Sequence, residues 1–438
     1  MSLKRETVQT VWDGEASGVS SRELYDVAII GGGAAGLFSA SLACEGGLSA
    51  IVIEPNKSLG RKLRITGKGR CNLTNNCSPE EVIRHTLRNP RFLYSSVYSF
   101  SPDMVMEWFS SHGVELKTER GGRVFPVSDR ADDVADAMAG LLEGNGVPVV
   151  RDRAKSLRVL QDGLIETGCT GTAVISKNVI IATGGLSYPK TGSTGDGYRL
   201  AAGLGHSVIP PSPSLVPVTV GESFVGSLTG LTLKNVTVSL CQRGRKKPVF
   251  SQLGELSFMP YGISGPLTLS ASSYMEESRL KNGEYTIYID LKPGLSHEKL
   301  AMKLNREFSL EPRLSLGEYL RRLLPAPMAE TVNNLLGIAC GTLCSQLNRE
   351  QRRNIINILK ELRLTPTGLR SIDEAIVTRG GIPVGEIDPG SMESRLVKGV
   401  YFAGEIIDVD AFTGGYNLQI AFSTAHSAVS AIIQSKKA

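Results

Sequence analysis

Several features that would assign this 438-residue chain to a simple class are scarce or missing. Its seven cysteines are odd in number and widely spaced, and no secretory signal is evident, so we expect no disulfide framework and a reducing, cytoplasmic location. No apolar run is long enough to cross a bilayer, so we expect no membrane partner. The net charge is only +5, and we therefore expect no nucleic-acid partner.

Metal ligands and targeting signals are also lacking. Cys340 and Cys344 lie four positions apart, but no histidine or further cysteine is nearby, so no metal site is expected. Residues 1–22 lack hydrophobic periodicity and mix both charge signs, which favours a poorly ordered extension over a transit peptide. The composition, with 41% hydrophobic and 21% charged residues, is typical of a globular protein of two or three domains. It does not indicate an oligomeric state.

The first strong motif is a glycine-rich turn that follows a predicted strand. The sequence YDVAII of residues 25–30 predicts a buried strand, and GGGAAG of residues 31–36 follows it directly. Gly31 permits a tight turn, Gly33 lets backbone amides approach a pyrophosphate, and Gly36 lets the next helix pack against the strand. This order of strand, GxGxxG and helix predicts a dinucleotide-binding domain.

The residues around this turn supply further groups for a dinucleotide. The helix N-terminus at Ala34 and Ala35 offers free backbone N–H groups and partial positive charge to the phosphates. The second predicted strand, SAIVIE, ends at Glu54, 21 positions after Gly33. At this position a carboxylate can accept hydrogen bonds from a ribose.

Two later segments end in a similar way, as buried strands followed by glycine. One is KNVIIATGG, which ends in Thr183, Gly184 and Gly185, and the other is GVYFAGE, which ends in Gly404 and Glu405. In flavoproteins of the glutathione-reductase type, the chain returns to FAD after a long insertion, and an acid at the last strand end binds the ribityl chain. The three strand ends resemble this arrangement and favour FAD over NAD as the bound cofactor.

A glycine turn and a long helix follow Glu405. In TGGYNLQIAFSTAHSAVSAII, the turn includes Gly415, and the helix is expected to begin near Tyr416 and Asn417. The N-terminus of this helix could face the pyrimidine edge of the flavin, where it would stabilise the negative charge that reduction places there. The same helix is expected to pack on the sheet.

The stretch GKGRCNLTNNC begins at Gly67, shortly after the predicted ribose-binding acid. We interpret it as a loop that cradles the cofactor, because Gly67 permits close backbone approach. Arg70 and the preceding Lys62 can neutralise phosphate or reduced-flavin charge, and Asn72 can hydrogen-bond a flavin ring edge.

An alternative interpretation of this stretch is a redox dithiol. Cys71 and Cys77 are separated by five residues, whereas disulfide reductases with a related fold have four between their cysteines. Such a reductase also needs a second dinucleotide domain, and no second GxGxxG lies at a strand–helix junction. We therefore favour Cys71 as a packing element beside the flavin.

Longer motifs resemble those of the bacterial BaiN/YhiN-like flavoproteins. They span residues 29–423 and include IIGGGAAGL, GRKLRITGKGRCNLTN, GRVFPVSDRADDV, ATGGLSYPKTGSTGDGYRLAAGLGH, YGISGP and EAIVTRGGIPVGEIDPGSMESRLVKGVYFAGEIIDVDAFTGGYNLQIAFS. Members of this family are NAD(P)/FAD-dependent oxidoreductases, and some are aminoacetone oxidase-like. The resemblance implies bound FAD, NAD(P)H as a transient reductant in a shared cleft, and a small organic substrate with an enone-like double bond or an amine.

The sequence predicts an α/β fold. A Rossmann-like FAD-binding domain of the glutathione-reductase type would carry an inserted β-rich domain and a small helical subdomain. The proline-rich run at 210–217 marks a boundary, after which apolar residues alternate with period two, and a phase slip at Lys234 and Asn235 predicts a bulge. Helical spacing begins near His297, and a strand at 374–378 is expected to return to the β-rich domain. We expect the FAD-binding domain at residues 23–206 and 380–438, the β-rich domain at 207–294 and 364–379, and the helical subdomain at 295–363.

Candidates for catalysis carry weaker signals. Tyr188 follows the ATGG turn, and Tyr261 lies in the glycine turn PYGISGP. Related sequences carry Thr-His-Tyr at the second turn, where this chain has Met-Pro-Tyr, which removes an obvious proton donor. Tyr416 and Cys71 are further candidates.

The sequence as a whole predicts an FAD-dependent oxidoreductase that moves a hydride between flavin N5 and a small organic substrate. One alternative is a flavin disulfide reductase that uses Cys71 and Cys77. Another is a non-catalytic flavoprotein that serves as a redox sensor or as an accessory to RNA modification.

Overall fold

The computed structural model describes residues 7–8 and 22–437, so the expected extension over residues 1–22 lies almost wholly outside the described residues. Two compact units are present among these residues. The first comprises those within Met1–Ser212 and Ile376–Ala438, and the second is Pro213–Ala375. Within the described residues, no helix combines the length and apolarity needed to cross a bilayer. The chain therefore leaves the first unit once and returns to it once.

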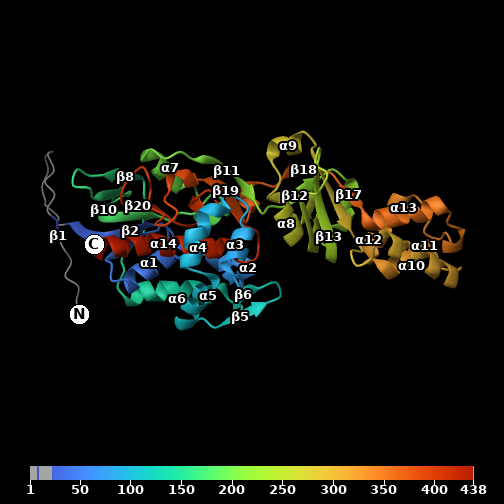
Figure 1. Cartoon of the computed structure of the whole chain (residues 1–438), viewed down its shortest axis with the longest axis horizontal. Coiled ribbons are helices and arrows are strands. Elements are labelled where there is room, and N and C mark those ends of the chain that lie inside the picture. Colours follow the sequence, from blue (N-terminus) through green and yellow to red (C-terminus); the bar gives the residue numbers. More distant parts are fainter. Residues whose placement is uncertain (1–6, 9–21, 438) are drawn as a thin grey trace. The chain divides into compact units, whose positions relative to one another are not determined.

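The first unit is built on a mostly parallel sheet (Figure 1). Its strands follow the order β7-β3-β2-β10-β9-β8, and β20 pairs with the carboxyl half of β10. Their bounds are β2 (Arg22–Ile30), β3 (Ala50–Ile53), β7 (Val149–Val150), β8 (Ser156–Val159), β9 (Ile165–Gly168), β10 (Ala173–Ile181) and β20 (Val400–Phe402), and β1 (Thr7–Val8) pairs with β2. The central strands are buried runs of β-branched residues, as expected for parallel strands covered on both faces.

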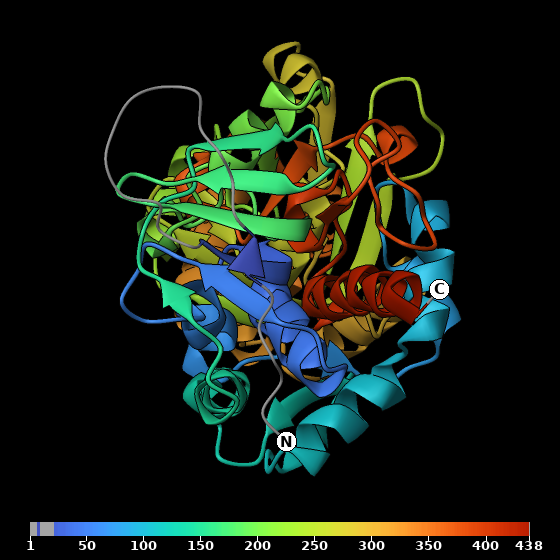
Figure 2. The same cartoon turned by 90° about the vertical axis from the view of Figure 1, so that its left-hand side faces the viewer.

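Two helices pack against each other beside this sheet. Figure 2 shows the red helix α14 (Tyr416–Lys437) lying beside the blue helix α1 (Ala34–Glu45). The ring of Phe38 on α1 lies 4.9 Å from the ring of Phe422 on α14 and 4.8 Å from that of Trp108. Both helices are rich in small residues, which let their backbones approach closely. The rings of Phe38, Phe422 and Trp108 pack together beside them.

The other elements of the first unit surround this core. They are α2 (Arg61–Gly69), β4 (Thr74–Asn75), α3 (Pro79–Arg84), α4 (Tyr94–Ser99), α5 (Pro102–Ser111), β5 (Leu116–Glu119), β6 (Arg123–Pro126), α6 (Ala131–Gly144), α7 (Asp196–Gly203), β11 (Ile209–Ser214) and β19 (Val377–Gly381). β11 and β19 form a two-stranded sheet at the point where the chain leaves and re-enters this unit. The sequence predicts that the strand at 374–378 returns to the β-rich domain. It is instead β19, which begins at Val377, belongs to the first unit and pairs with β11, and the last strand of the second unit is β18, Pro366–Leu369.

The second unit contains an antiparallel sheet of order β17-β16-β13-β14-β15-β12-β18. The register of β13 against β14 shifts between Leu233 and Val236, and Asn235 has a φ of 58°, so the predicted bulge is confirmed. The strand bounds are β12 (Val218–Val220), β13 (Thr232–Gln242), β14 (Phe250–Met259), β15 (Gly262–Ser264), β16 (Tyr285–Asp290), β17 (Leu362–Leu364) and β18 (Pro366–Leu369).

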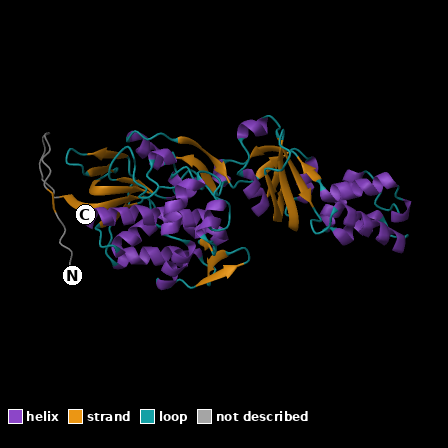
Figure 3. Cartoon of the chain, in the orientation of Figure 1, coloured by secondary structure: helices purple, strands orange, loops and turns teal. Residues whose placement is uncertain are grey.

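Helices make up the rest of the second unit (Figure 3). Its helices are α8 (Pro266–Ser272), α9 (Glu277–Lys281), α10 (His297–Leu310), α11 (Leu316–Leu323), α12 (Ala326–Leu336) and α13 (Arg349–Lys360). The last four cover the span expected to be helical. Ser315 and Asn348 close capping boxes at the starts of α11 and α13, which explains where these helices begin.

We expect Gly36→Ala to destabilise the first unit. A Cβ at Gly36 would lie 1.9 Å from the carbonyl oxygen of Gly31, so the start of α1 must move away from the turn. The expected loss in the free energy of unfolding is about 1–3 kcal/mol, the range for overpacked cores. Chemical denaturation measures it. Gly140→Ala in α6 is the matched control, because its Cβ meets nothing within 4 Å, and it should leave stability equal or higher. Equal stability of the two variants would contradict the packing role of Gly36.

Candidate functional site

The glycine turn between β2 and α1 packs closely on the end of β10 but is open on its outer side. Gly31 has a φ of 107°, and a Cβ there would lie 2.5 Å from the carbonyl oxygen of Ala182. Gly33 is the N-cap of α1, and a Cβ there would meet nothing within 4 Å. The space beside Gly33 at the start of α1 is therefore free of protein atoms, and the motif predicts that backbone amides bind a ligand there.

The Glu54 carboxylate lies against this turn. Its Oε2 accepts a hydrogen bond of 2.7 Å from the amide of Gly32. Its Oε1 accepts hydrogen bonds of 2.8 Å and 2.6 Å from the backbone and side-chain nitrogens of Asn56. These bonds hold the carboxylate at the carboxyl end of β3, the edge at which parallel sheets bind their ligands.

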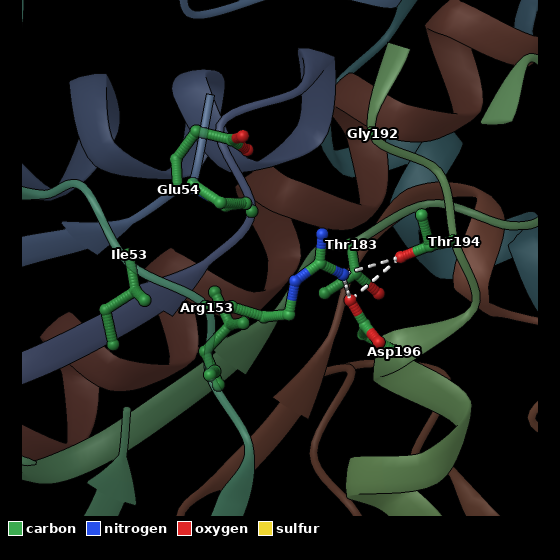
Figure 4. Close-up of a pocket in the computed structure, with 11 residues that line it drawn as sticks. Ile53, Glu54, Arg153, Thr183, Gly192, Thr194 and Asp196 are labelled. Carbon is green, nitrogen blue, oxygen red and sulfur yellow. Dashed lines mark hydrogen bonds and ion pairs between the residues drawn. The ribbon is translucent and has the colours of Figure 1, made fainter. Parts of the chain in front are cut away.

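A pocket opens beside Glu54 (Figure 4). Arg153 points toward Thr194 and Asp196; it donates a hydrogen bond of 3.0 Å to Thr194 Oγ1 and forms an ion pair with Asp196. The pocket is lined by Ile30, Gly31, Ile53, Glu54, Pro55, Arg153, Ala154, Thr183, Gly192, Thr194 and Asp196. Sequence reasoning missed Arg153 and Thr194, although the STGDG segment within the quoted family motif contains Thr194 and Asp196.

A second polar cluster forms around Glu405, directly after β20. The carboxylate accepts hydrogen bonds of 2.6 Å from Lys62 Nζ, 2.7 Å from Ser187 Oγ and 2.6 Å from the amide of Thr378. Lys62 also donates to Ser187 Oγ at 2.7 Å and lies 5.9 Å from the centre of the Tyr188 ring. The structure thus joins three residues that the sequence singled out, Lys62, Tyr188 and Glu405, and adds Ser187 and Thr378.

The turn after β10 completes this cluster. Gly184 has a φ of 71°, and a Cβ at Gly185 would lie 2.3 Å from Thr378 Oγ1, so only glycine fits there. The Oγ1 atom of Thr183 is buried and has no hydrogen-bond partner among the described residues. Gly404 packs against α1, because a Cβ there would lie 2.8 Å from the Cβ of Ala35. The three predicted strand ends therefore converge on one edge of the sheet.

The last residues of α2 and the loop that follows have an unusual, non-helical backbone. Gly67, Lys68 and Cys71 all have a φ near 60°, and Gly67 lies against the amide of Asn72. The Oδ1 atom of Asn72 is buried without a hydrogen-bond partner in the described part of the chain. A buried, unpaired carbonyl oxygen is costly, and a ligand N–H group would satisfy it.

Arg70 lies in a different setting from the one expected. Its guanidinium forms ion pairs with Glu119 and Asp129 and lies 4.2 Å from the centre of the Phe125 ring. Arg70 has two carboxylate partners, whereas Lys62 has one, Glu405, beside the strand end predicted to bind the cofactor. Lys62 is therefore the better-placed cation for a cofactor, and Arg70 holds the hairpin of β5 and β6.

The start of α14 is held by its own surroundings. A Cβ at Gly415 would lie 2.3 Å from the carbonyl of Thr74, so the turn packs tightly on β4. The Tyr416 ring stacks on His85 with 4.4 Å between ring centres, and burial raises the pKa of Tyr416. The Asn417 amide bonds to the backbone of Ala411 and Phe412. Side chains of Tyr416 and Asn417 thus position the helix start, leaving its backbone amides as the groups for a ligand.

The remaining catalytic candidates differ in accessibility. Cys71 is fully buried, and burial raises the pKa of its thiol. Tyr261 belongs to the second unit, where its hydroxyl lies 3.5 Å from Glu374 and its ring lies 4.3 Å from the Arg370 guanidinium. Tyr188 is half-buried beside Lys62.

The residues present fit FAD. The open space at Gly33, the carboxylates of Glu54 and Glu405, and the unpaired atom of Thr183 lie at the carboxyl edge of the sheet, and the unpaired atom of Asn72 lies in the loop after α2, the helix that carries Lys62. Acceptors at the two ends suit ribose and ribityl hydroxyls, and free amides between them suit a pyrophosphate.

We expect Gly33→Ala to weaken FAD binding without unfolding the protein. The added methyl group meets no protein atom, but it occupies the space in which backbone amides approach the pyrophosphate. FAD affinity, measured by fluorescence titration of the apoprotein, should fall about tenfold or more, an increase of about 1.4 kcal/mol in binding free energy. Gly140→Ala, the same chemical change at an open helical site, should leave the affinity unchanged. Unchanged affinity in Gly33→Ala would contradict the assignment.

We expect slow alkylation of Cys77 in the native protein. Burial, together with Glu81 and Asp103, raises the pKa of the Cys77 thiol to about 11. Because only the thiolate reacts, its rate with iodoacetamide at pH 8 should be roughly 100-fold below that of an ordinary thiol and should rise about tenfold per pH unit toward pH 11. Mass spectrometry of the labelled peptide measures this. Exposed Cys340 is the internal control, and equal rates at both cysteines would contradict the prediction.

Comparison with known proteins identifies the family. The family described as HI0933-like protein Rossmann domain matches residues 25–431. A ribosomal RNA dihydrouridine synthase from Escherichia coli (strain K12) is 33% identical over 94% of this chain and 99% of its own length. A 3-dehydro-bile acid delta(4,6)-reductase from Clostridium scindens is 29% identical over 92% and 97%.

A solved structure aligns along most of the chain as well. The 3-ketosteroid delta1-dehydrogenase from Sterolibacterium denitrificans covers 94% of this chain and 100% of its own, at 14% identity and a TM-score of 0.49. A similarity of this size carries no information about function.

The family match and the full-length relatives confirm the predicted family, fold class and FAD as the cofactor. The protein belongs to the HI0933-like family of FAD-dependent oxidoreductases, the family of the BaiN/YhiN-like flavoproteins, and has a Rossmann-type FAD-binding domain.

Proposed function

We propose that this protein is an FAD-dependent reductase that saturates a carbon–carbon double bond conjugated to a carbonyl group, with NAD(P)H as the electron source. The observation that carries the proposal is the convergence of three glycine-flanked strand ends, with Lys62 and Glu405 paired at one of them. This edge suits a cofactor that gains negative charge, because the Lys62 ammonium and the N-terminus of α1 both lie there.

The names of the relatives support a reduction. Dihydrouridine differs from uridine by a saturated carbon–carbon bond next to a carbonyl, and a delta(4,6)-reductase of a 3-dehydro-bile acid saturates bonds conjugated to the 3-oxo group. In the reaction proposed for this chain, a hydride adds to the end of the conjugated double bond remote from the carbonyl, and a proton adds to its other end. NAD(P)H supplies the two electrons, and water or a side chain supplies the proton.

Few residues of the chain need to take part in this chemistry. A bound FAD supplies the hydride from N5. Amides at Gly33 to Ala35 would bind the pyrophosphate, and Glu54 and Glu405 would accept hydrogen bonds from sugar and ribityl hydroxyls. Lys62 places positive charge beside Glu405, and Tyr188, next to Lys62, is the best candidate for a proton donor. Tyr416 and Cys71 are less suitable, because both are buried and burial raises the pKa of each.

As substrate we propose a uridine in ribosomal RNA. Relatives with that printed activity come from Escherichia coli and from Haemophilus influenzae, at 33% and 31% identity, and this chain covers 99% and 96% of them. The bile-acid reductase is comparably long but 29% identical. This proposal replaces the expectation that no nucleic acid is a partner, and a cytoplasmic location fits it.

The two alternative functions receive less support. A dithiol mechanism needs a thiolate, and burial raises the pKa of Cys71 and raises that of Cys77 to about 11. A redox sensor binds flavin without turning over a substrate. Only an activity measurement therefore distinguishes it from a reductase.

We expect NADH or NADPH to bleach the flavin anaerobically and the reduced protein to form dihydrouridine in a ribosomal RNA transcript. Mass spectrometry of the digested transcript measures the product, and a simple enone serves as a second acceptor. Lys62→Met should lower the rate about 10- to 100-fold, because it removes the cation beside Glu405. Lys398→Met removes an exposed lysine elsewhere and should leave the rate unchanged.

Cys77→Ser separates the remaining alternatives. A reductase of conjugated double bonds keeps full turnover in this variant, whereas a dithiol enzyme loses it. Bleaching without dihydrouridine and without enone reduction would contradict the proposed reaction and favour a sensor.

A further inference from the structure

The inserted unit carries the whole net charge of the chain. Residues 213–375 contain 20 basic and 15 acidic side chains, whereas the remaining residues contain 28 of each. The total of +5 therefore conceals a neutral cofactor-binding unit and a basic inserted one. A field of this kind attracts anionic partners to one part of the molecule.

Most of this excess lies in the helical segment of the inserted unit. Residues 295–363 contain 11 basic and 7 acidic side chains. Several of the acids are engaged within the segment: Glu311 pairs with Arg322 at 2.6 Å, Glu318 bonds to Ser315 in a capping box, and Glu307 accepts from the Tyr319 hydroxyl at 2.9 Å. They are therefore not available to neutralise the other cations.

Seven exposed cations of this segment have no ion pair or side-chain hydrogen bond among the described residues: Arg363 on β17, and six more between the start of α10 and the end of α13. We call these six the helical basic patch: Lys299, Arg306, Arg313, Arg321, Arg349 and Arg353. Five of the six are arginines, whose planar forks match phosphate oxygens in pairs.

Helices α10 and α13, which carry four of the six residues of this patch, pack against each other. The two helices pack together where Arg352 donates a hydrogen bond of 3.1 Å to Asn305 and lies 5.5 Å from the centre of the Phe308 ring. Figure 1 shows α10 to α13 grouped beside the sheet of their unit. Arg349 and Arg353 are four residues apart and so share one face of α13.

The exposed side of α10 is both basic and apolar. The helix buries Leu300, Leu304 and Phe308, and Arg306 lies one turn from each of two exposed apolar residues. These are Met302 at 64% and Leu310 at 73% of full exposure. Apolar side chains beside unpaired arginines offer contacts to sugars and bases as well as to phosphates.

We propose that the helical basic patch binds the sugar–phosphate backbone of the RNA whose uridine is reduced. The inference rests on the proposed function and identifies the unit that holds this substrate. Charge complementarity carries it: the unpaired arginines and the uneven distribution of charge both fit a polyanion, and Glu307, Glu311 and Glu318 are already engaged within the segment.

The test is a triple variant, Arg306→Gln, Arg349→Gln and Arg353→Gln, in the full-length protein loaded with FAD. The probe is a ribosomal RNA transcript, and binding is measured by fluorescence anisotropy between 50 and 200 mM salt (about the range over which phosphate contacts respond). Affinity should fall about tenfold or more, and the slope of log K against log salt should flatten by about 2–3 for three lost contacts.

The matched control is Arg91→Gln, Arg120→Gln and Lys398→Gln, which removes three exposed cations from the first unit. It should bind as the wild type does. Equal loss in both triple variants, no loss in the patch variant, or no binding by the wild type would overturn the proposal.

Dihydrouridine formation in the same samples separates this inference from the proposed function. Patch-dependent binding without dihydrouridine would overturn the reaction but support the surface. Dihydrouridine formed at the wild-type rate by the patch variant would support the reaction and overturn the surface. Flavin bleaching by NAD(P)H should be the same in all three proteins, which shows that the variants are folded.

Discussion

The carboxylate of Glu405 is the interaction on which the cofactor-binding unit depends most. It bonds to Lys62, 343 positions earlier, to Ser187, 218 positions earlier, and to Thr378, 27 positions earlier. Thr378 lies on the strand by which the chain re-enters this unit after the insertion. One acidic side chain therefore connects four segments, and removal of either member of a partly buried ion pair leaves a charge that the protein must solvate in another way.

The residues around this carboxylate combine close packing with polar atoms that have no hydrogen-bond partner among the described residues. Glycines at 31, 36, 185 and 404 occupy positions where a Cβ would overlap a neighbouring atom, so the strand ends approach each other more closely than other residues permit. In the same region Thr183 Oγ1 and Asn72 Oδ1 are buried without partners among the described residues. Each costs about 1–3 kcal/mol when unsatisfied, so a ligand that satisfies them also stabilises the fold.

The two units divide the physical requirements of the proposed reaction. The first is neutral overall and places its polar groups inside a glycine-lined edge, which suits a tightly held dinucleotide. The second carries the excess of basic residues on helical surfaces, which suits a large anionic substrate. A reductase that uses flavin needs few acid–base groups, and this explains why the candidate tyrosines and cysteines lack the strongly activated environment of hydrolytic residues.

Short motifs determined much of this protein by themselves. GGGAAG between a strand and a helix, an acid 21 positions after Gly33, and two later strands ending in glycine can only be accommodated at the carboxyl edge of a parallel sheet, so the FAD-binding domain was predictable. The bulge at Asn235 was predictable as well, because a change of phase in alternating residues forces one extra residue into the strand.

Long-range pairing was decided only by the tertiary structure. Nothing in the local sequence shows that Arg70 meets Glu119 and Asp129, that Arg153 reaches Thr194 and Asp196, or that Lys62 meets Glu405. The same holds for β19, which the sequence predicted at 374–378: its apolar residues suit either unit, and only the pairing with β11 assigns it to the first. A side chain's partner depends on which distant segments the fold brings within a few ångströms, and local propensity and spacing contain no information about that distance.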